Sequence, residues 1–242
     1  MTPADLIAFN PRPRIERVPL HDGHCCLVVD DALLAPERLV ELAADRRAEF
    51  VAVDFNAYPG VLYPSPVAVS LALNAFFVEH VRRHFDARRN VHMHSRLALV
   101  TLAPHELQPC QWLCHRDSVG LEPEHSIQAS VLYLFHDAGL GGTSFYRPNL
   151  PEYETALLFH EASTLPAAAF AAKYDLRPAY LCASNRYFTR TASIPARWNR
   201  LIFYDGSVLH SGDVVAPERL SADPRVGRLS LNGFFTCRRR AA

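Results

Sequence analysis

The sequence predicts a mainly β protein of the α+β type, with helices gathered in its first third. Three observations favour this class. From about residue 91 onward, short apolar runs alternate with turn residues, a spacing typical of a sandwich, a barrel or a jelly roll. Before residue 90 the apolar residues recur at helical spacing. No polar linker or internal repeat divides the 242 residues, so we expect a single domain over residues 1–242.

Two helices are expected in the amino-terminal part, residues 1–90. The first follows Pro36 and covers residues 37–44, where apolar and charged residues alternate at helical spacing. The second begins at Ser65–Pro66, with the serine as a cap and the proline at the first helical position, and runs to about Phe85. We expect this mixed, partly helical part to pack on the β core.

The β core is expected over residues 91–237. An insertion at about 147–198 interrupts it and contains an Ala-rich helix at about 164–174. The candidate strands cover residues 94–103, 127–135, 143–146, 155–159, 186–192, 200–205 and 228–237.

Composition excludes several classes of function. The formal net charge is zero and the pI is near 7.2, so nothing predicts binding to nucleic acid or to an anionic membrane. No apolar stretch reaches 18 residues and the first 19 residues lack a signal-peptide core, so we expect a cytoplasmic protein that does not enter a membrane. Oligomeric state cannot be inferred.

The cysteine and arginine usage adds two expectations. The six cysteines form no CxxC pair and no disulfide-like ladder, as in a reduced cytosolic protein. Of the 25 basic residues, Lys173 is the single lysine and the rest are arginines, a coding bias typical of a GC-rich bacterial genome.

The second half of the chain contains a candidate metal-binding set. His115 and Asp117 stand two residues apart, so on a strand both side chains point to the same face. His210 follows a later apolar strand and can supply a third ligand. Two imidazoles and one carboxylate with open coordination positions are what a non-haem Fe(II) oxygenase uses to hold its metal.

Other cysteine and histidine groups compete with this interpretation. Cys110 and Cys114 precede His115, but no second Cys/His pair completes a zinc site. His92 and His94 form another pair on one face of a strand, but no carboxylate accompanies them, and we interpret them as residues of a strand edge.

An ordered series of motifs from about Leu99 to Thr236 resembles a known family. The series comprises Cys114-His115-Arg116-Asp117, Ser130-Val131-Leu132-Tyr133-Leu134, Gly141-Gly142-Thr143-Ser144-Phe145, Asn199-Arg200-Leu201-Ile202-Phe203-Tyr204, Val208-Leu209-His210-Ser211-Gly212 and Arg228-Leu229-Ser230-Leu231-Asn232-Gly233-Phe234-Phe235. In this order the motifs resemble the Fe(II)/2-oxoglutarate-dependent oxygenases, and within them the prolyl-4-hydroxylase-like branch.

The resemblance implies a double-stranded β-helix, or jelly roll, with helices buttressing one sheet. It implies Fe(II), 2-oxoglutarate and O2 as cofactor, cosubstrate and oxidant. His115, Asp117 and His210 would hold the metal, and Arg228 and Ser230 would bind the distal carboxylate of 2-oxoglutarate. The expected reaction couples oxidative decarboxylation of 2-oxoglutarate to hydroxylation of a small metabolite or a peptide side chain.

The chain departs from the family pattern in two long spacings, from His115 to His210, because of the segment 147–198, and from His210 to Arg228. The second spacing leaves an alternative open, because Arg225 lies three residues before Arg228 as a rival anchor. Arg228 is favoured because Ser230 follows it in an apolar run, whereas Arg225 lies in a turn-like segment. Related halogenases lack the carboxylate ligand, so Asp117 disfavours halogenation.

Two other classes of function remain open. A jelly-roll sensor would bind the metal and 2-oxoglutarate without turnover, and a non-redox enzyme of the cupin type would need no carboxylate anchor such as Arg228. Production of succinate separates an oxygenase from a sensor. The identity of the substrate cannot be inferred.

Overall fold

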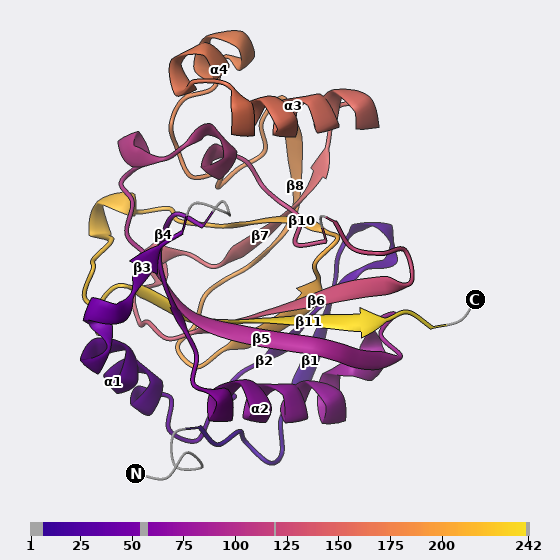
Figure 1. Cartoon of the computed structure of the whole chain (residues 1–242), viewed down its shortest axis with the longest axis vertical. Helices are drawn as coiled ribbons and strands as arrows, with labels where there is room; N and C mark the ends of the chain where they lie inside the picture. The colour runs from indigo at the N-terminus through magenta and orange to yellow at the C-terminus, as the bar shows by residue number, and fades with distance from the viewer. Residues whose placement is uncertain (1–6, 54–57, 119, 241–242) are drawn as a thin grey trace.

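One sheet combines strands from the second half of the chain with strands from the amino-terminal part. The computed structural model describes residues 7–53, 58–118 and 120–240. Within these ranges two antiparallel sheets lie face to face between helices (Figure 1). This is the jelly-roll architecture that the sequence predicts, mainly β with buttressing helices.

The large sheet contains strands from both halves of the chain in the order β1-β2-β9-β6-β11-β5-β4-β3. Its longest strands, β5 and β11, pair over almost their whole length, with one register shift between Thr236 and Cys237. The strands are β1 (Ile15–Pro19), β2 (Cys25–Val29), β9 (Leu201–Asp205), β6 (His125–Tyr133), β11 (Arg228–Arg238), β5 (Arg89–Val100), β4 (Gly60–Pro64) and β3 (Val51–Ala52).

The small sheet has the order β10-β7-β8. Its strands are β10 (Leu209–Gly212), β7 (Thr143–Pro148) and β8 (Phe188–Ile194). Gly141 and Gly142 lead into β7, and both positions require glycine. Gly141 has a φ of +71°, and a Cβ on Gly142 would lie 1.9 Å from the carbonyl oxygen of Ile194.

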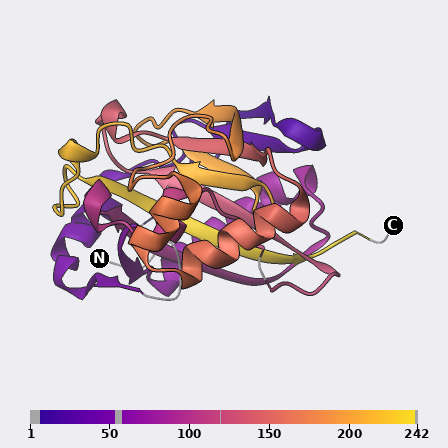
Figure 2. The same cartoon turned by 90° about the horizontal axis from the view of Figure 1, so that it is seen from above.

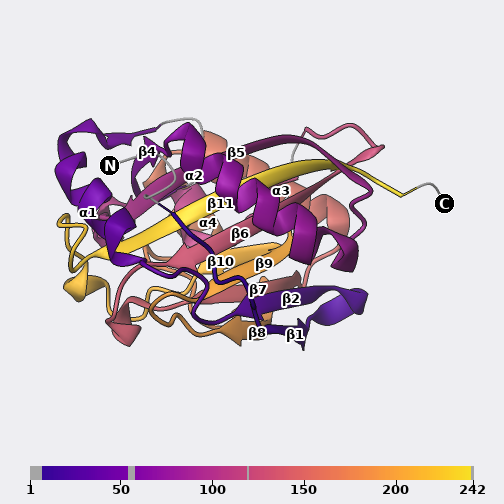
Figure 3. The same ribbon diagram turned by 90° about the horizontal axis from the view of Figure 1, so that it is seen from below.

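Helices cover the outer faces of the two sheets. Helix α2 (Val67–Phe76) crosses the large sheet (Figure 3), with α1 (Glu37–Asp45) beside it. Helices α3 (Glu152–Thr164) and α4 (Ala167–Tyr174) lie on the side of the small sheet (Figure 2). The layers are therefore helix, large sheet, small sheet and helix.

Alternation along β11 connects these layers to the site. Leu229, Leu231 and Phe235 point outward into the apolar core beneath α1 and α2. The intervening residues, including Arg228 and Ser230, line the cavity between the sheets. Because successive side chains of a strand face opposite sides, one strand supplies both core and site.

The amino-terminal part contributes more strand than the helical pattern suggests. Besides α1 and α2, it supplies β1 to β4 to the large sheet. Strand β2, with the sequence CCLVV, is buried along its whole length between β1 and β9. A short continuous apolar run is typical of a strand covered on both faces.

One predicted strand is wrong. Residues 155–159 lie inside helix α3 and not in a strand. Pro151 precedes the first turn, Glu152 and Glu154 lie within it, and Leu158 packs into the apolar core between α3 and the small sheet. Acidic residues stabilise the first turn of a helix, so the flanking residues decide against a strand.

The second predicted helix is shorter and starts differently. It begins at Val67, with Pro66 before it and no hydrogen bond from a capping side chain. Ser65 is therefore not the predicted cap. After Phe76 the chain continues as a π turn over Phe77–Val81 and a 3₁₀ turn over Arg82–His84. Likewise, the Ala-rich helix begins at Ala167, because the Thr164 end of α3 precedes it.

Among the described residues, no helix combines the length and the hydropathy needed to cross a bilayer.

Candidate metal centre and its pocket

His210 lies on β10, in the small sheet. The neighbouring Leu209 points outward into the core beneath α3 and α4. Alternation therefore directs His210 toward the space between the sheets, where its side chain lines a cavity.

The segment carrying His115 and Asp117 is held beside β10 by backbone hydrogen bonds. It is not a strand, as the interpretation of the two-residue spacing assumed, and pairs with β10 only through an isolated bridge between His115 and His210. Each of these residues donates its N–H to the carbonyl oxygen of the other, at 2.9 and 3.0 Å. The N–H of Asp117 donates to Gly206 at 2.8 Å. These bonds keep the two side chains on the same side, as the spacing of two residues predicts.

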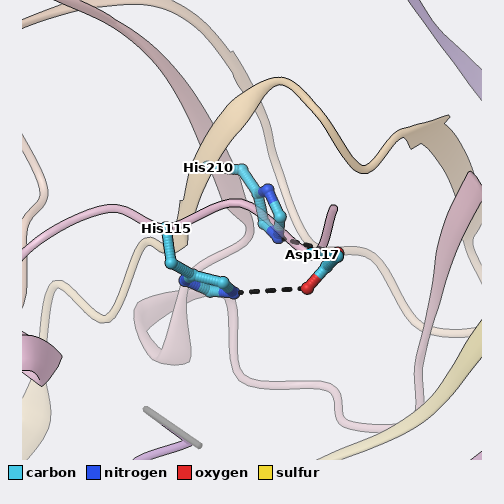
Figure 4. A group of neighbouring side chains, drawn as sticks. All are labelled: His115, Asp117 and His210. Carbon is cyan, nitrogen blue, oxygen red and sulfur yellow. Dashed lines mark ion pairs between the residues drawn. The ribbon is translucent and has the colours of Figure 1, made fainter. Parts of the chain in front are cut away.

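The three side chains point toward one another (Figure 4). The Asp117 carboxylate faces the Nε2 ends of both rings, with Oδ1 3.7 Å from His115 Nε2 and Oδ2 3.4 Å from His210 Nε2. All three potential ligand atoms lie within 4.8 Å of one another. The sequence places these residues up to 95 positions apart, and the fold brings them together.

Hydrogen bonding prepares His210 to act as a ligand. Its Nδ1 lies 2.9 Å from the carbonyl oxygen of Val208. A carbonyl oxygen only accepts, so Nδ1 carries the proton and the lone pair of Nε2 faces the centre.

His115 is also prepared to bind as a neutral imidazole. Burial and, to a smaller extent, the neighbouring His210 lower the pKa of His115 to about 4, while Asp117 opposes the shift. The side chain keeps 45% of its surface accessible, but this surface lines the cavity. With its pKa lowered to about 4, the ring is neutral near pH 7.

The residues fit a divalent metal ion. Asp117 Oδ2 is buried and accepts no hydrogen bond, which is costly for a carboxylate oxygen unless a cation meets it. Two neutral imidazoles and one carboxylate on one side leave positions open for other ligands, the arrangement that non-haem Fe(II) enzymes use.

The cavity beside this centre has a volume of about 490 Å³, within the range of small-molecule sites. Its walls come from the inner face of the large sheet, the small sheet and several loops. The loop residues include Tyr58 and Pro59 from the amino-terminal part and Tyr180 from the predicted insertion.

Arg228 lies in the wall of this cavity and is only 5% exposed. Its Nε donates to the carbonyl oxygen of Leu140 and its Nη2 to that of Gly142, each at 2.8 Å. The Gly-Gly turn thereby positions the guanidinium. In the part of the chain that the structure describes, Arg228 forms no ion pair.

Ser230 and Arg225 differ in their relation to the cavity. Ser230 is 1% exposed and lines the cavity two residues along β11 from Arg228. Arg225 lies outside, in a surface turn, where its guanidinium is 3.6 Å from the carboxylate of Asp223. The geometry therefore brings Arg228 and Ser230 to the metal-binding set, and leaves Arg225 away from it.

Sequence reasoning missed Arg96 and Asn232 of the same cavity, and interpreted His94, which also lines it, as a strand-edge residue. Arg96 and His94 project from β5, and Asn232 faces Arg96 across the strand pair. His94 stacks on Phe234 with ring centroids 5.0 Å apart. The alternation of β11 continues the Arg228-x-Ser230 pattern to Asn232 and Phe234, and this was the signal available in the sequence.

A family model covers most of the chain. The model of a family of unknown function, DUF6445, matches residues 11–235. The chain belongs to this family. Comparison with curated proteins gives no match.

Solved structures extend the comparison to three dimensions. The non-heme alpha-ketoglutarate-dependent carbocyclase SnoK from nogalamycin biosynthesis matches with a TM-score of 0.50 and 13% identity, over 88% of this chain and 79% of SnoK. At this identity the match shows a shared fold.

Two further structures resemble the chain more weakly. The alpha-ketoglutarate-dependent epimerase SnoN gives a TM-score of 0.47 and 12% identity, over 89% of this chain and 81% of SnoN. HygX from Streptomyces hygroscopicus, with nickel and 2-oxoglutarate bound, gives 0.43 and 11%, over 88% and 82% of the two chains.

Proposed function

We propose that this member of the DUF6445 family is an Fe(II)- and 2-oxoglutarate-dependent dioxygenase of the prolyl-4-hydroxylase-like branch, which hydroxylates a small molecule. The observation that carries the proposal is the convergence of His115, Asp117 and His210, with a carboxylate oxygen that is buried and unpartnered. The order of motifs along the chain and the jelly-roll fold shared with SnoK support it.

His115, Asp117 and His210 would hold the iron. When bound, Fe(II) would supply the chemistry that couples decarboxylation of 2-oxoglutarate by O2 to oxidation of a substrate C–H bond. The hydrogen bond between His210 Nδ1 and the carbonyl oxygen of Val208 orients the His210 ring, and the lowered pKa of His115 keeps that imidazole neutral. Both Nε2 atoms face Asp117. The Asp117 carboxylate balances part of the metal's charge in the shielded site.

Arg228 and Ser230 would bind the distal carboxylate of 2-oxoglutarate. A guanidinium has five N–H donors, and the carbonyl oxygens of Leu140 and Gly142 occupy two of them. One donor on Nη2 and two on Nη1 remain. They include the parallel pair that binds a carboxylate with two hydrogen bonds, and Ser230 can add a hydroxyl donor.

A small molecule is favoured over a peptide side chain as the substrate. The cavity of about 490 Å³ lies between the two sheets, and Tyr58 and Tyr180 contribute to its walls. Sites of this size suit compact ligands. A peptide would need an extended groove leading past these residues.

The test is consumption of 2-oxoglutarate by the purified protein with Fe(II) and O2, followed as succinate formed. We expect succinate from the wild type and none from His210→Ala, and a circular-dichroism melt checks that the variant folds. Binding of 2-oxoglutarate without succinate under any substrate tried would support the sensor alternative. Absence of both metal and 2-oxoglutarate binding would refute the proposal.

A further inference from the structure

The lining of the cavity is strongly cationic although the chain as a whole is neutral. Three arginines, Arg96, Arg116 and Arg228, line it together with a single carboxylate, that of Asp117. Arginine stays protonated in proteins. A divalent metal ion would add two positive charges and 2-oxoglutarate would remove two. The loaded site would thus retain an excess of two positive charges.

Arg96 is the cation that the proposed roles leave unexplained. It lies on β5 opposite Asn232, four residues along the paired strands from Arg228, or about 13 Å at the rise of a β-strand. The charge of Arg96 contributes to the lowered pKa of His115, so Arg96 lies on the side of the metal-binding set. Arg228 is instead held at the Gly-Gly turn. The two guanidinium groups therefore occupy different regions of one cavity.

The guanidinium of Arg96 is held in place, and its Nε lacks a hydrogen-bond partner. Its Cζ lies 4.6 Å from the centroid of the Phe234 ring, which orients the planar group. Its Nε is buried with no hydrogen-bond partner, and Arg96 forms no ion pair within the described ranges. A buried donor left unsatisfied is destabilising, so a ligand that accepts from it is favoured.

Asn232 presents a second unsatisfied group beside Arg96. Its Oδ1 is buried with no hydrogen-bond partner, and the residue lines the cavity. Oxygen and nitrogen of an amide exchange places on a half-turn of the side chain. The turned amide offers an NH2 donor next to the guanidinium, and together the two side chains form a donor set for an oxyanion.

We propose that Arg96 and Asn232 bind an anionic group, a carboxylate or a phosphate, of the substrate to be oxidised. The inference rests on the proposed function, because it takes Arg228 as the site of 2-oxoglutarate. The anion would face the metal-binding set from β5, and the remaining part of the substrate would fill the cavity near His115 and Asp117. Arg116, which is exposed, would add positive charge near the same centre.

The test uses three matched probes on the full chain loaded with Mn(II) and 2-oxoglutarate: benzoate, phenyl phosphate and benzamide. Calorimetry gives each dissociation constant, and Mn(II)-enhanced relaxation of the probe protons shows whether a probe binds near the metal. We expect benzoate or phenyl phosphate to bind at least about tenfold more tightly than benzamide, because charge-assisted hydrogen bonds contribute about 1.5–3 kcal/mol. The probe that binds more tightly shows whether the site prefers a carboxylate or a phosphate.

Variants identify the residues. Arg96→Gln is expected to remove the preference for the anion, and Arg96→Lys to keep part of it. Asn232→Asp should weaken anion binding about tenfold, since it places a carboxylate opposite the guanidinium. Arg89→Gln is the matched control, because Arg89 is an exposed arginine on the same strand and lies outside this cavity. Melting curves verify folding, and Arg96→Lys and Asn232→Asp test the inference if Arg96→Gln fails to fold.

Three results would overturn the inference. The first is equal binding of benzamide and both anions by the wild type, and the second is full anion binding by Arg96→Gln. The third is a loss of 2-oxoglutarate affinity in Arg96→Gln, which would assign Arg96 to the cosubstrate. Failure of the proposed function is distinguishable, because a wild type that does not bind 2-oxoglutarate refutes that function directly.

Discussion

Replacement of Arg228 by methionine tests the proposed cosubstrate anchor quantitatively. The guanidinium donates to two backbone carbonyl oxygens at 2.8 Å, and a parallel pair of N–H donors remains for a carboxylate. Charge-assisted hydrogen bonds contribute about 1.5–3 kcal/mol each. Taking the lower value for both, the loss is about 3 kcal/mol. That loss corresponds to a dissociation constant for 2-oxoglutarate raised roughly 100-fold.

The same substitution also affects stability. In Arg228→Met the carbonyl oxygen of Leu140 loses its donor, at about 1–3 kcal/mol if it stays buried and unpaired, whereas the carbonyl oxygen of Gly142 keeps the N–H of Asp213 at 2.9 Å. Arg228→Lys keeps the charge without the planar fork, so we expect an intermediate affinity for 2-oxoglutarate. Thermal melts followed by circular dichroism separate loss of fold from loss of binding.

The assay is a calorimetric titration of 2-oxoglutarate into the Mn(II)-loaded protein, with Arg225→Met as the matched control. Arg225 forms an exposed pair with Asp223, and such pairs contribute about 0–1 kcal/mol. We therefore expect Arg225→Met to bind 2-oxoglutarate like the wild type. If Arg225→Met loses affinity while a folded Arg228→Met does not, the choice of Arg228 is refuted.

Three further predictions concern the metal centre and the sheet. Asp117→Asn should lower the affinity for Mn(II) at least about tenfold, because a neutral amide replaces the only carboxylate of the set; unchanged calorimetric affinity would contradict the ligand assignment. Gly206→Ala should weaken metal binding, because its Cβ would lie 2.8 Å from Ile127 and 3.0 Å from Asp117 Cβ; electron paramagnetic resonance of bound Mn(II) checks this. Asp30→Asn should destabilise the fold by about 1 kcal/mol at pH 7. Hydrogen bonds from Arg200 hold the pKa of Asp30 below its usual value. The stabilisation is therefore present above pH 4 and is lost as the pH falls through the lowered pKa, so the difference from wild type should vanish in acid melts.

Local residue patterns were sufficient for the elements whose period is unambiguous. The expected helix at 37–44 lies within α1, and the strand at 228–237 lies within β11. The segment 155–159 was predicted wrongly because five residues with a short apolar run satisfy both a strand and a turn of helix. Whether such a segment forms a strand depends on the strands available to pair with it. Those partners can be distant in sequence, as β9 is from β2.

The candidate site also contains residues that the sequence predicts and residues that only the structure reveals. His115, Asp117 and His210 were recognisable because a metal-binding set has a characteristic spacing and order, and the fold brings the three together. Arg96 was not, since an arginine in a strand is usually interpreted as a solvent-facing residue. Its inward direction becomes evident only from the register, which pairs it with Asn232.

Along β11, residues that stabilise the core alternate with residues that line the cavity. Leu229 and Leu231 are fully buried beneath the helices, whereas Ser230 and Asn232 line the cavity. Shortening an outward leucine removes core packing and costs about 2–5 kcal/mol, while changing an inward residue removes hydrogen-bonding groups offered to ligands. Because the side chain alternates with a period of two, a slip of one residue between β11 and β5 would exchange these sets. The core that fixes this register therefore also fixes which arginines face the metal-binding set.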